Sequence, residues 1–239
     1  MENQMKRRTF LKAVPACAVL AGAANSMTQE MGTSSSPALE PIMLVKPETG
    51  GGKSVLAALK ERSTNRNVST RKLPPQMLSN LLWAAFGVNR EEGALRGRTG
   101  RTAASASNSQ EIDLYVALPA GVYIYEAIPH RLSPVVSGDF RARAGRRAAA
   151  TAPVNIFYVV DIAKYAKAPF QEPGLKDPEV QKSYYYAATG LIAGNVYLFA
   201  ASQGLAAWFH NCDRRNTAKE FKLRPDQRVL FAQTVGFPA

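Results

Sequence analysis

The segment that most restricts the fold lies near the middle of the chain, where six of the seven residues from Val154 to Val160 are apolar. A short continuous apolar run of this kind predicts a β-strand that is buried on both faces. Two earlier segments, Ile112–Leu118 and Gly121–Tyr125, alternate like the paired strands of a hairpin. Behind the buried strand, Tyr184–Gln203 predicts a long core helix with a glycine directly after it, and Phe231–Pro238 predicts a last core strand.

Composition and charge narrow the class of protein. Hydrophobic residues make up 46% of the 239 residues and charged residues 20%, as in a globular protein with one sizeable core. No stretch behind the N-terminal segment approaches the roughly 18 apolar residues that would span a bilayer. The net charge is +12, but the basic residues are scattered or lie in arginine-rich loops, and no basic helix carries interleaved aromatic residues. We therefore predict a domain with no membrane span and no nucleic-acid partner.

Cysteine and histidine are too few for a metal centre. Cys17 lies in the N-terminal segment, so Cys212 is the one thiol that we expect in the remaining domain, and no internal disulfide is predicted. The two histidines, His130 and His210, are far apart in the sequence. Without clustered ligands, we predict no metal site.

The first residues have the three parts of an export signal. Lys6–Lys12 resembles the twin-arginine motif, Ala13–Ala24 is a short apolar region, and small residues at Ala21-Gly22-Ala23 suit a signal peptidase. We predict that residues 1–26 are a twin-arginine signal peptide and that the protein is exported, for example to the periplasm. Residues 27–52 are predicted to be a flexible linker, because the stretch to Pro41 is rich in Ser, Thr, Pro and Gly. The domain is then expected over residues 53–239.

A glycine-rich segment offers an alternative interpretation as a nucleotide-binding P-loop. Ile42–Val45 resembles a strand, Gly50–Ser54 reads Gly-Gly-Gly-Lys-Ser, and Val55–Leu59 resembles a helix. However, Pro47 stands where the first glycine of that motif belongs, and proline has no N–H to offer a phosphate. A P-loop NTPase is therefore the third and least favoured hypothesis. We expect the glycines to form a hinge and Ser54 to cap the helix.

Polar residues follow this first helix in a pattern that suits a phosphate group. The residues are Arg62, Ser63, Thr64 and Arg66. Guanidinium groups are forked, charged donors, and the hydroxyls can satisfy the remaining phosphate oxygens. A second candidate segment contains Ser105, Asn108 and Gln110, whose short polar side chains can present both donors and acceptors to a ligand.

These segments occur in an order that resembles the nitroreductase family. That family begins with a helix followed by Arg-x-Ser-x-Arg or Lys, to which Arg62, Thr64 and Arg66 correspond, and continues with a second helix that Leu73–Arg90 matches. A later Pro-Ser-x-x-Asn-x-Gln loop corresponds to residues 104–110. The wording of residues 81–90, LLWAAFGVNR, is similar to the branch called SagB/ThcOx-like dehydrogenases.

The resemblance implies a fold, a cofactor and a partner. The implied fold is α+β, a mixed, mostly antiparallel sheet wrapped by helices, in a homodimer with FMN sites at the interface. Residues 62–66 would hold the FMN phosphate, and Ser105, Asn108 and Gln110 would line the flavin ring and ribityl chain, often from the partner subunit. FMN itself would carry the two-electron (hydride) chemistry.

Several positions depart from the family pattern. Thr64 replaces a serine and Ala104 replaces the proline. Where relatives have an acidic or arginine-containing segment near the flavin, this chain has Trp208–Asp213, in which Phe209 and His210 are the candidate flavin contacts. Lys164-Tyr165 has the wording of a Lys-Tyr pair in peptide-azoline dehydrogenases, but its position gives no reason to assign it, so no catalytic residue is predicted.

The resulting hypothesis is an exported FMN-dependent oxidoreductase with an unknown small-molecule or peptide substrate. Its electron donor is open, because NAD(P)H is scarce outside the cytoplasm. The alternative is a flavin-binding or small-molecule-binding protein without turnover.

Overall fold

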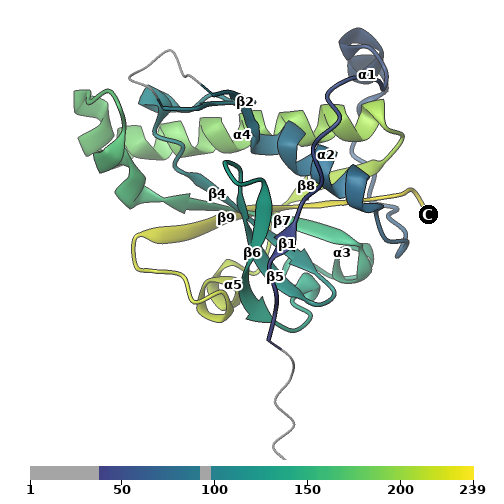
Figure 1. The fold of residues 1–239 in the computed structure, drawn as a ribbon. Helices are drawn as coiled ribbons and strands as arrows, with labels where there is room; N and C mark the ends of the chain where they lie inside the picture. Colours follow the sequence, from purple (N-terminus) through teal and green to yellow (C-terminus); the bar gives the residue numbers. More distant parts are fainter. Residues whose placement is uncertain (1–37, 92–97) are drawn as a thin grey trace, which may run out of the picture. The chain divides into compact units, whose positions relative to one another are not determined.

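The computed structural model describes residues 38–91 and 98–239 (Figure 1). The predicted signal peptide and the predicted linker up to residue 37 lie outside the described residues. The strands are β1 (Ile42–Met43), β2 (Val88–Arg90), β3 (Gly100–Arg101), β4 (Ile112–Leu118), β5 (Gly121–Glu126), β6 (Arg131–Ser137), β7 (Val154–Asp161), β8 (Ala206–His210) and β9 (Gln227–Gly236). The α-helices are α1 (Val55–Glu61), α2 (Pro75–Phe86), α3 (Ala148–Thr151), α4 (Pro178–Ser202) and α5 (Arg214–Glu220). Short 3₁₀ helices are η1 (Ala106–Asn108), η2 (Arg141–Arg143), η3 (Ile162–Lys167) and η4 (Pro173–Lys176).

The main sheet has seven strands in the order β1-β6-β5-β4-β7-β9-β8, and every neighbouring pair in it is antiparallel. The predicted hairpin is confirmed as β4 and β5. The predicted buried strand is confirmed as β7, in which all eight residues are buried. The α+β fold with a mostly antiparallel sheet is therefore confirmed.

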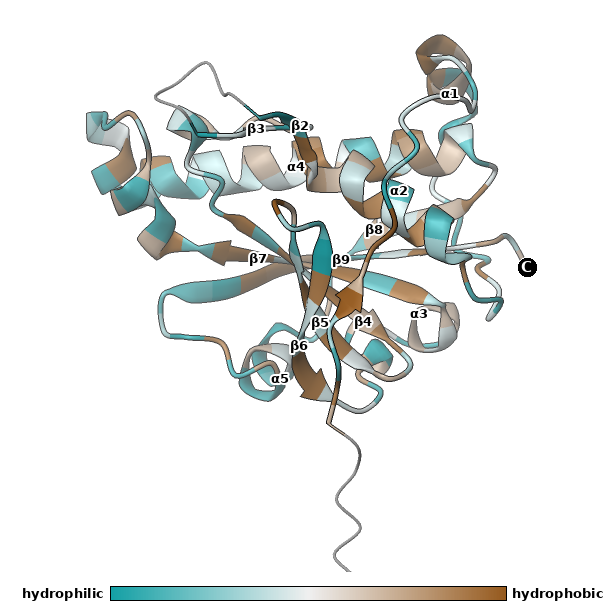
Figure 2. Ribbon diagram, viewed as in Figure 1, coloured by the Kyte–Doolittle hydropathy of each residue, from teal (hydrophilic) through white to brown (hydrophobic). Residues whose placement is uncertain are grey.

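Helices cover both faces of this sheet, which explains why β7 is apolar throughout. In Figure 1, α4 crosses one face together with α1 and α2, and α3 and α5 lie on the other. Side chains alternate along a strand, so Ile156 and Tyr158 join the core under α4, whereas Phe157 and Val159 join the core beside α5. Figure 2 shows the hydrophobic residues of the strands between these two helical layers.

The long helix begins earlier than the apolar pattern predicts. We expected it over Tyr184–Gln203, but α4 begins at Pro178, because its first turns are polar and stabilised by a cap. The carboxylate of Asp177 accepts hydrogen bonds from the backbone N–H groups of Glu179 and Val180. At the other end, Gly204 has a φ of 68°, the conformation that a helix-terminating glycine adopts.

The N-terminal part of the described chain joins the sheet. Ile42 and Met43 lie in the stretch predicted as linker, yet they pair with Leu132 and Arg131 of β6. Ser54 caps α1 as expected, since its Oγ accepts a hydrogen bond from the N–H of Ala57.

The segment that resembled a P-loop is used to support α1. The amine of Lys53 pairs with the Glu61 carboxylate at the far end of this helix. The lysine of a P-loop has to reach a phosphate, so this pair speaks against the NTPase hypothesis. None of the helices within residues 38–91 and 98–239 is both long and apolar enough to cross a membrane.

Candidate functional site

The predicted phosphate residues lie along the free edge of β8. After α1 the chain runs beside this strand, and the N–H of Asn65 donates a hydrogen bond to the carbonyl oxygen of Ala207 at 3.0 Å. The guanidinium carbon of Arg62 lies 5.5 Å from the ring centre of Tyr197 in α4, and that of Arg66 lies 5.5 Å from the ring centre of Trp208 in β8. Both arginines are thereby positioned by cation–π contacts while they stay exposed.

The hydroxyl of Thr64 is connected by hydrogen bonds to α4 and, through Tyr197, to β8. Its Oγ1 lies 3.0 Å from the hydroxyl of Tyr197, which also accepts a hydrogen bond from the N–H of Phe209 at 2.9 Å. Ser63 is exposed beside it. Tyr197 has no sequence signal for this role, because it is one aromatic residue among several in a core helix.

Phe209 and His210 point to opposite faces of the sheet, as neighbours in a strand do. Phe209 packs under α4 against Phe231, with ring centres 4.8 Å apart, so half-buried packing is its main role here. His210 lies on the other face and packs against Trp208, with ring centres 4.1 Å apart. Burial lowers the pKa of His210, and the positive charge of Arg66 lowers it further, against a raising effect of the Asn211 carbonyl.

The two arginines have no acidic partner among the described residues. Arg141, Arg143 and Arg224, by contrast, each pair with a carboxylate. Unpaired guanidinium groups beside an accepting or donating hydroxyl fit an oxyanion such as a phosphate.

The second predicted segment forms a strained loop between β3 and β4. Ser107, Asn108 and Gln110 have φ values of 49°, 52° and 53°. This left-handed region is uncommon for residues other than glycine, and such strain is found preferentially at functional sites. The loop is held together by its own hydrogen bonds, including one from the N–H of Gln110 to the Oγ of Ser105 at 3.0 Å.

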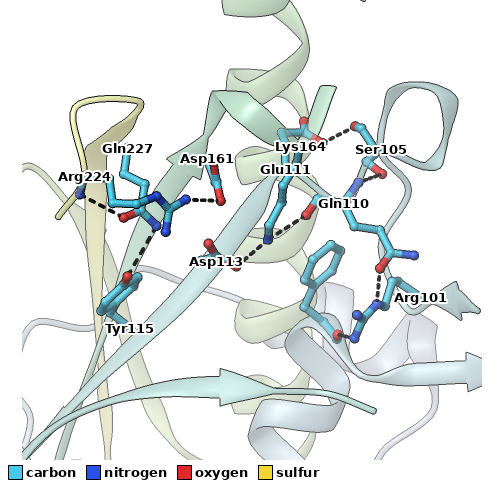
Figure 3. A network of polar contacts seen from close by, with 12 residues as sticks. Arg101, Ser105, Gln110, Glu111, Asp113, Tyr115, Asp161, Lys164, Arg224 and Gln227 are labelled. Atoms are coloured by element: carbon cyan, nitrogen blue, oxygen red, sulfur yellow. Dashed lines mark hydrogen bonds and ion pairs between the residues drawn. The ribbon is translucent and has the colours of Figure 1, made fainter. Parts of the chain in front are cut away.

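Gln110 supports the loop instead of facing a ligand. Its side chain is buried, and its amide oxygen accepts a hydrogen bond from Arg101 at 2.8 Å (Figure 3). Its amide nitrogen donates to the carbonyl oxygen of Thr99 at 2.8 Å and to the Oδ1 of Asn108 at 3.0 Å. Ser105, Ser107 and Asn108 line a hollow of about 430 Å³, within the size range of small-molecule sites. Of the predicted residues in this loop, Ser105 and Asn108 therefore line the hollow, although the Asn108 amide also bonds to Thr99 and Gln110.

We expect Gln110→Ala to destabilise the domain by about 1–3 kcal/mol, because it leaves the Nε–H of the half-buried Arg101 without its acceptor and removes one of the two donors to the Thr99 carbonyl oxygen. Urea unfolding monitored by circular dichroism measures this change. Gln76→Ala is the matched control, since that half-buried glutamine makes two hydrogen bonds at the edge of α2. Equal losses in both variants would contradict a special role for Gln110.

Polar contacts continue from this loop through Lys164 to Asp113 in β4 (Figure 3). The Lys164 amine pairs with the Asp113 carboxylate and donates to the carbonyl oxygen of Gln110 at 3.2 Å. Burial raises the pKa of Asp113, although Lys164 opposes the shift. The Tyr165 hydroxyl donates to the carbonyl oxygen of Gln181 at 3.2 Å. Both members of the Lys164-Tyr165 pair are thus engaged in structural contacts.

One chain does not bring the two predicted halves together. Among the described residues, no hydrogen bond, ion pair or aromatic contact joins residues 62–66 to residues 105–110, and none of Arg62, Thr64 and Arg66 lines the hollow beside the loop. No group of three or more His, Cys, Asp or Glu side chains in the described part of the chain is arranged to hold a metal ion.

Comparison with known proteins identifies the class that this fold and these residues define. The family model described as the nitroreductase family matches residues 59–237. The chain therefore belongs to the nitroreductase family, whose members are typically FMN-dependent oxidoreductases. A comparison with curated proteins gives no match.

Solved structures support the same assignment. A protein of Ralstonia eutropha JMP134 assigned as a nitroreductase is 32% identical, covers 84% of this chain and 90% of its own, and has a TM-score of 0.74. A similarly assigned protein of Anabaena variabilis ATCC 29413 is 17% identical, with a TM-score of 0.60 over 77% of this chain and 38% of its own. The E. coli microcin synthetase McbBCD complex with truncated pro-MccB17 contains a chain that is 16% identical, with a TM-score of 0.59 over 97% of this chain and 85% of its own. At these lower identities the likeness concerns the fold.

Proposed function

We propose that this protein is an FMN-dependent oxidoreductase that transfers two electrons, as a hydride, between its flavin and a small-molecule or peptide substrate. The observation that carries the proposal is a pair of arginines at the edge of β8 that have no acidic partner among the described residues. Arg62 lies over the ring of Tyr197, Arg66 lies over the ring of Trp208, and the Thr64 hydroxyl lies 3.0 Å from the Tyr197 hydroxyl. When bound, FMN supplies the two-electron chemistry, and the protein supplies its placement and electrostatics.

The residues present fit this cofactor. Arg62, Thr64 and Arg66 would hold the phosphate, with Ser63 exposed beside them. Ser105 and Asn108 offer donors and acceptors toward the hollow that they line, and Gln110 keeps their loop in shape.

The proposed assembly is a homodimer in which the loop of one chain completes the site of the other. Its support is a face of α4 that carries apolar side chains exposed within the described part of the chain: Tyr186 is 38% and Leu191 is 53% exposed. A Cβ atom at Gly190 or Gly194 would meet no heavy atom within 4 Å, so a second helix has room to approach closely. Exposed apolar patches of this kind mark interaction sites.

Gly190→Arg is expected to abolish the dimer, because it places a charged, bulky side chain in the middle of this face. Size-exclusion chromatography with light scattering measures the oligomeric state, and flavin absorbance measures the accompanying loss of FMN. Ala120→Arg, in the exposed turn between β4 and β5, is the control. A Gly190→Arg protein that stays dimeric would overturn this interface.

Export by the twin-arginine route and membership of the SagB/ThcOx-like branch are further parts of the proposal. The first is supported by Lys6–Lys12 with the apolar stretch behind it, and the second by the wording of residues 81–90. Cell fractionation of the full chain beside a variant with Arg7 and Arg8 replaced by lysine tests the route. Retention of the native chain in the cytoplasm would contradict it.

The visible spectrum of the purified protein tests the flavin proposal. Oxidised-flavin bands that dithionite bleaches are expected, and a colourless protein that fails to bind added FMN would sink the proposal. Photoreduction followed by reoxidation with different acceptors separates an enzyme from a flavin-binding protein without turnover. The altered segment Trp208–Asp213 is the reason to make this second test. NAD(P)H is one donor to compare with other reductants.

A further inference from the structure

The two hydrogen bonds of the His210 ring both require an N–H donor, whereas a neutral imidazole has only one N–H. The Asn155 amide nitrogen donates to the carbonyl oxygen of Ala149 at 2.8 Å, so its Oδ1 faces Thr234 as an acceptor. The Thr234 hydroxyl donates to that oxygen at 2.6 Å, which uses its only proton. His210 Nε2, 2.9 Å from the same hydroxyl, must therefore donate to it, and Nδ1, 2.8 Å from the carbonyl oxygen of Asn211, must donate as well.

Exchanging the positions of the oxygen and nitrogen of the Asn155 amide would let His210 stay neutral, but it would bury two acceptors facing each other. Its oxygen would then face the carbonyl oxygen of Ala149, and two acceptors would meet in a fully buried place. If Thr234 instead donates to a neutral His210, the buried Oδ1 of Asn155 loses its donor. Both contacts of His210 are satisfied together only by the imidazolium form.

The other histidine shows the contrasting case. Ser79 donates to the carbonyl oxygen of Val45 at 2.5 Å, so its Oγ accepts from His130 Nε2 at 2.7 Å. His130 Nδ1 accepts from the Tyr125 hydroxyl at 2.9 Å. The Tyr125 hydroxyl, the neutral imidazole and the Ser79 hydroxyl each donate one proton to one acceptor. A neutral His130 therefore satisfies all three hydrogen bonds.

The charges that face His210 oppose a proton on it unless an anion is present. Arg66 and the imidazole both contact the Trp208 ring, and the charge of Arg66 acts on His210. The segment from η2 to α3 approaches on another side, since His210 Cε1 lies 3.9 Å from the place of a Cβ on Gly145, and Arg146 and Arg147 follow that glycine exposed to solvent. Asp213 and Glu220 also lie nearby, and both pair with Arg143. The Arg214 guanidinium donates to the Asn211 Oδ1 at 3.1 Å, so it adds a further positive charge on this side. Cys212 is half-buried with a pKa raised to about 12, so it contributes no negative charge near neutral pH.

We propose that His210 takes up a proton when a phosphate-bearing ligand binds beside Arg66, and that the charge of the imidazolium stabilises this anion while both of its N–H groups stay bonded to Thr234 and Asn211. Without the ligand, burial and Arg66 keep the pKa of His210 below its usual value and one of its hydrogen bonds is mismatched. The anion reverses the electrostatic balance and completes both hydrogen bonds. The identity of the ligand as FMN rests on the proposed function, whereas the coupling of proton and anion does not.

The sign of the pH dependence follows from this coupling. Anion binding raises the pKa of His210, so the affinity increases as the pH falls through the pKa of the liganded protein. It stops increasing below the pKa of the free protein, where His210 already has its proton. Each unit of difference between the two pKa values corresponds to about tenfold in affinity.

Nitrogen-15 NMR of the full chain labelled at histidine measures the protonation directly. Only two imidazoles contribute, and His210→Gln identifies the signals that belong to His210. Sulfate is the probe, because this tetrahedral dianion does not titrate between pH 5 and 9, and chloride at equal ionic strength is the reference. We expect sulfate to raise the pKa of His210 by about one unit or more and to leave His130 unchanged. If the pKa of His210 is the same in sulfate and in chloride, the inference is wrong.

Two variants test the place of the anion. In Arg66→Gln, the His210 titration should respond several-fold less to sulfate, and in Arg71→Gln it should respond as in the native chain. Arg71 is an equally exposed arginine in the same loop, stacked on Phe237 at 3.9 Å. Calorimetry should also show sulfate binding at least fivefold tighter at pH 6 than at pH 8, a difference that His210→Gln abolishes. Retention of that difference in His210→Gln would overturn the inference.

FMN and riboflavin separate this inference from the proposed function. FMN is expected to protonate His210, whereas riboflavin, which lacks the phosphate, is not. An equal effect of riboflavin would overturn the assignment to a phosphate. If FMN fails to bind but sulfate protonates His210, the flavin function fails and the inference stands. If FMN binds and His210 does not change, the inference fails and the flavin function stands.

Discussion

Replacing Arg62 and Arg66 together with glutamine is expected to weaken FMN binding by roughly 100-fold or more. Hydrogen bonds from charged groups are among the strongest that a protein makes, and two of them would be lost at the phosphate. Both side chains are exposed and have no acidic partner in the described part of the chain, so the fold should be unchanged. Quenching of flavin fluorescence during titration with FMN measures the affinity.

Arg71→Gln combined with Arg215→Gln is the control for this experiment, because it removes the same charge from two other exposed arginines. It should bind FMN nearly as tightly as the native chain. Riboflavin lacks the phosphate, so its affinity should differ less than that of FMN between the native protein and the variant with Arg62 and Arg66 replaced. If the variant with Arg62 and Arg66 replaced by glutamine purifies with a full complement of FMN, residues 62–66 do not hold the phosphate.

Phe221→Ala is expected to lower the free energy of unfolding by about 3–5 kcal/mol, the cost of removing a large aromatic side chain from a closed core. Phe221 is 1% exposed, directly after α5. Its ring centre lies 5.1 Å from Phe157, 5.9 Å from Tyr115 and 6.2 Å from Phe140, so it joins the sheet to the segment that carries η2. Urea unfolding gives the change in stability.

The exposed Phe170 provides the comparison for this variant. Its side chain is 52% exposed, and Phe170→Ala should change the stability by no more than about 0.5 kcal/mol. Trp208 packs against the same core as Phe221. We therefore expect Phe221→Ala to weaken FMN binding as well. Similar stability losses in the two variants would show that the core on the α5 side contributes little.

Much of the fold was predictable, because its central elements have local signatures. The continuous apolar run in β7 and the alternation in β4 and β5 both reflect burial that neighbouring residues share. The start of α4 was missed, since its first turns face solvent and carry no apolar period. Ile42–Val45 resembles a strand in the sequence but falls within the predicted linker, because a two-residue strand such as β1 has little pattern of its own and depends on its pairing with β6.

The candidate site was predictable in its residue types and less so in its roles. Gln110 appeared as a possible ligand contact, but the left-handed backbone of its loop turns the side chain inward to Arg101 and Thr99. Tyr197 and Trp208 were not selected, because aromatic residues in a helix or strand usually signal packing alone. Their contacts with Arg62 and Arg66 give them a second role.

By itself, the sequence determined the family, the buried central strand and the arginine pair with its hydroxyls, since each depends on residues close together in the chain. Only the tertiary structure decided which groups surround that pair. The pairing of Asn65 with Ala207 brings Arg66 to Trp208, and the register of β8 with β9 brings His210 to Thr234 and, through it, to Asn155. These contacts join residues far apart in the sequence. The number of protons that His210 needs for its hydrogen bonds therefore depends on the assembled sheet and cannot be read from a local sequence pattern.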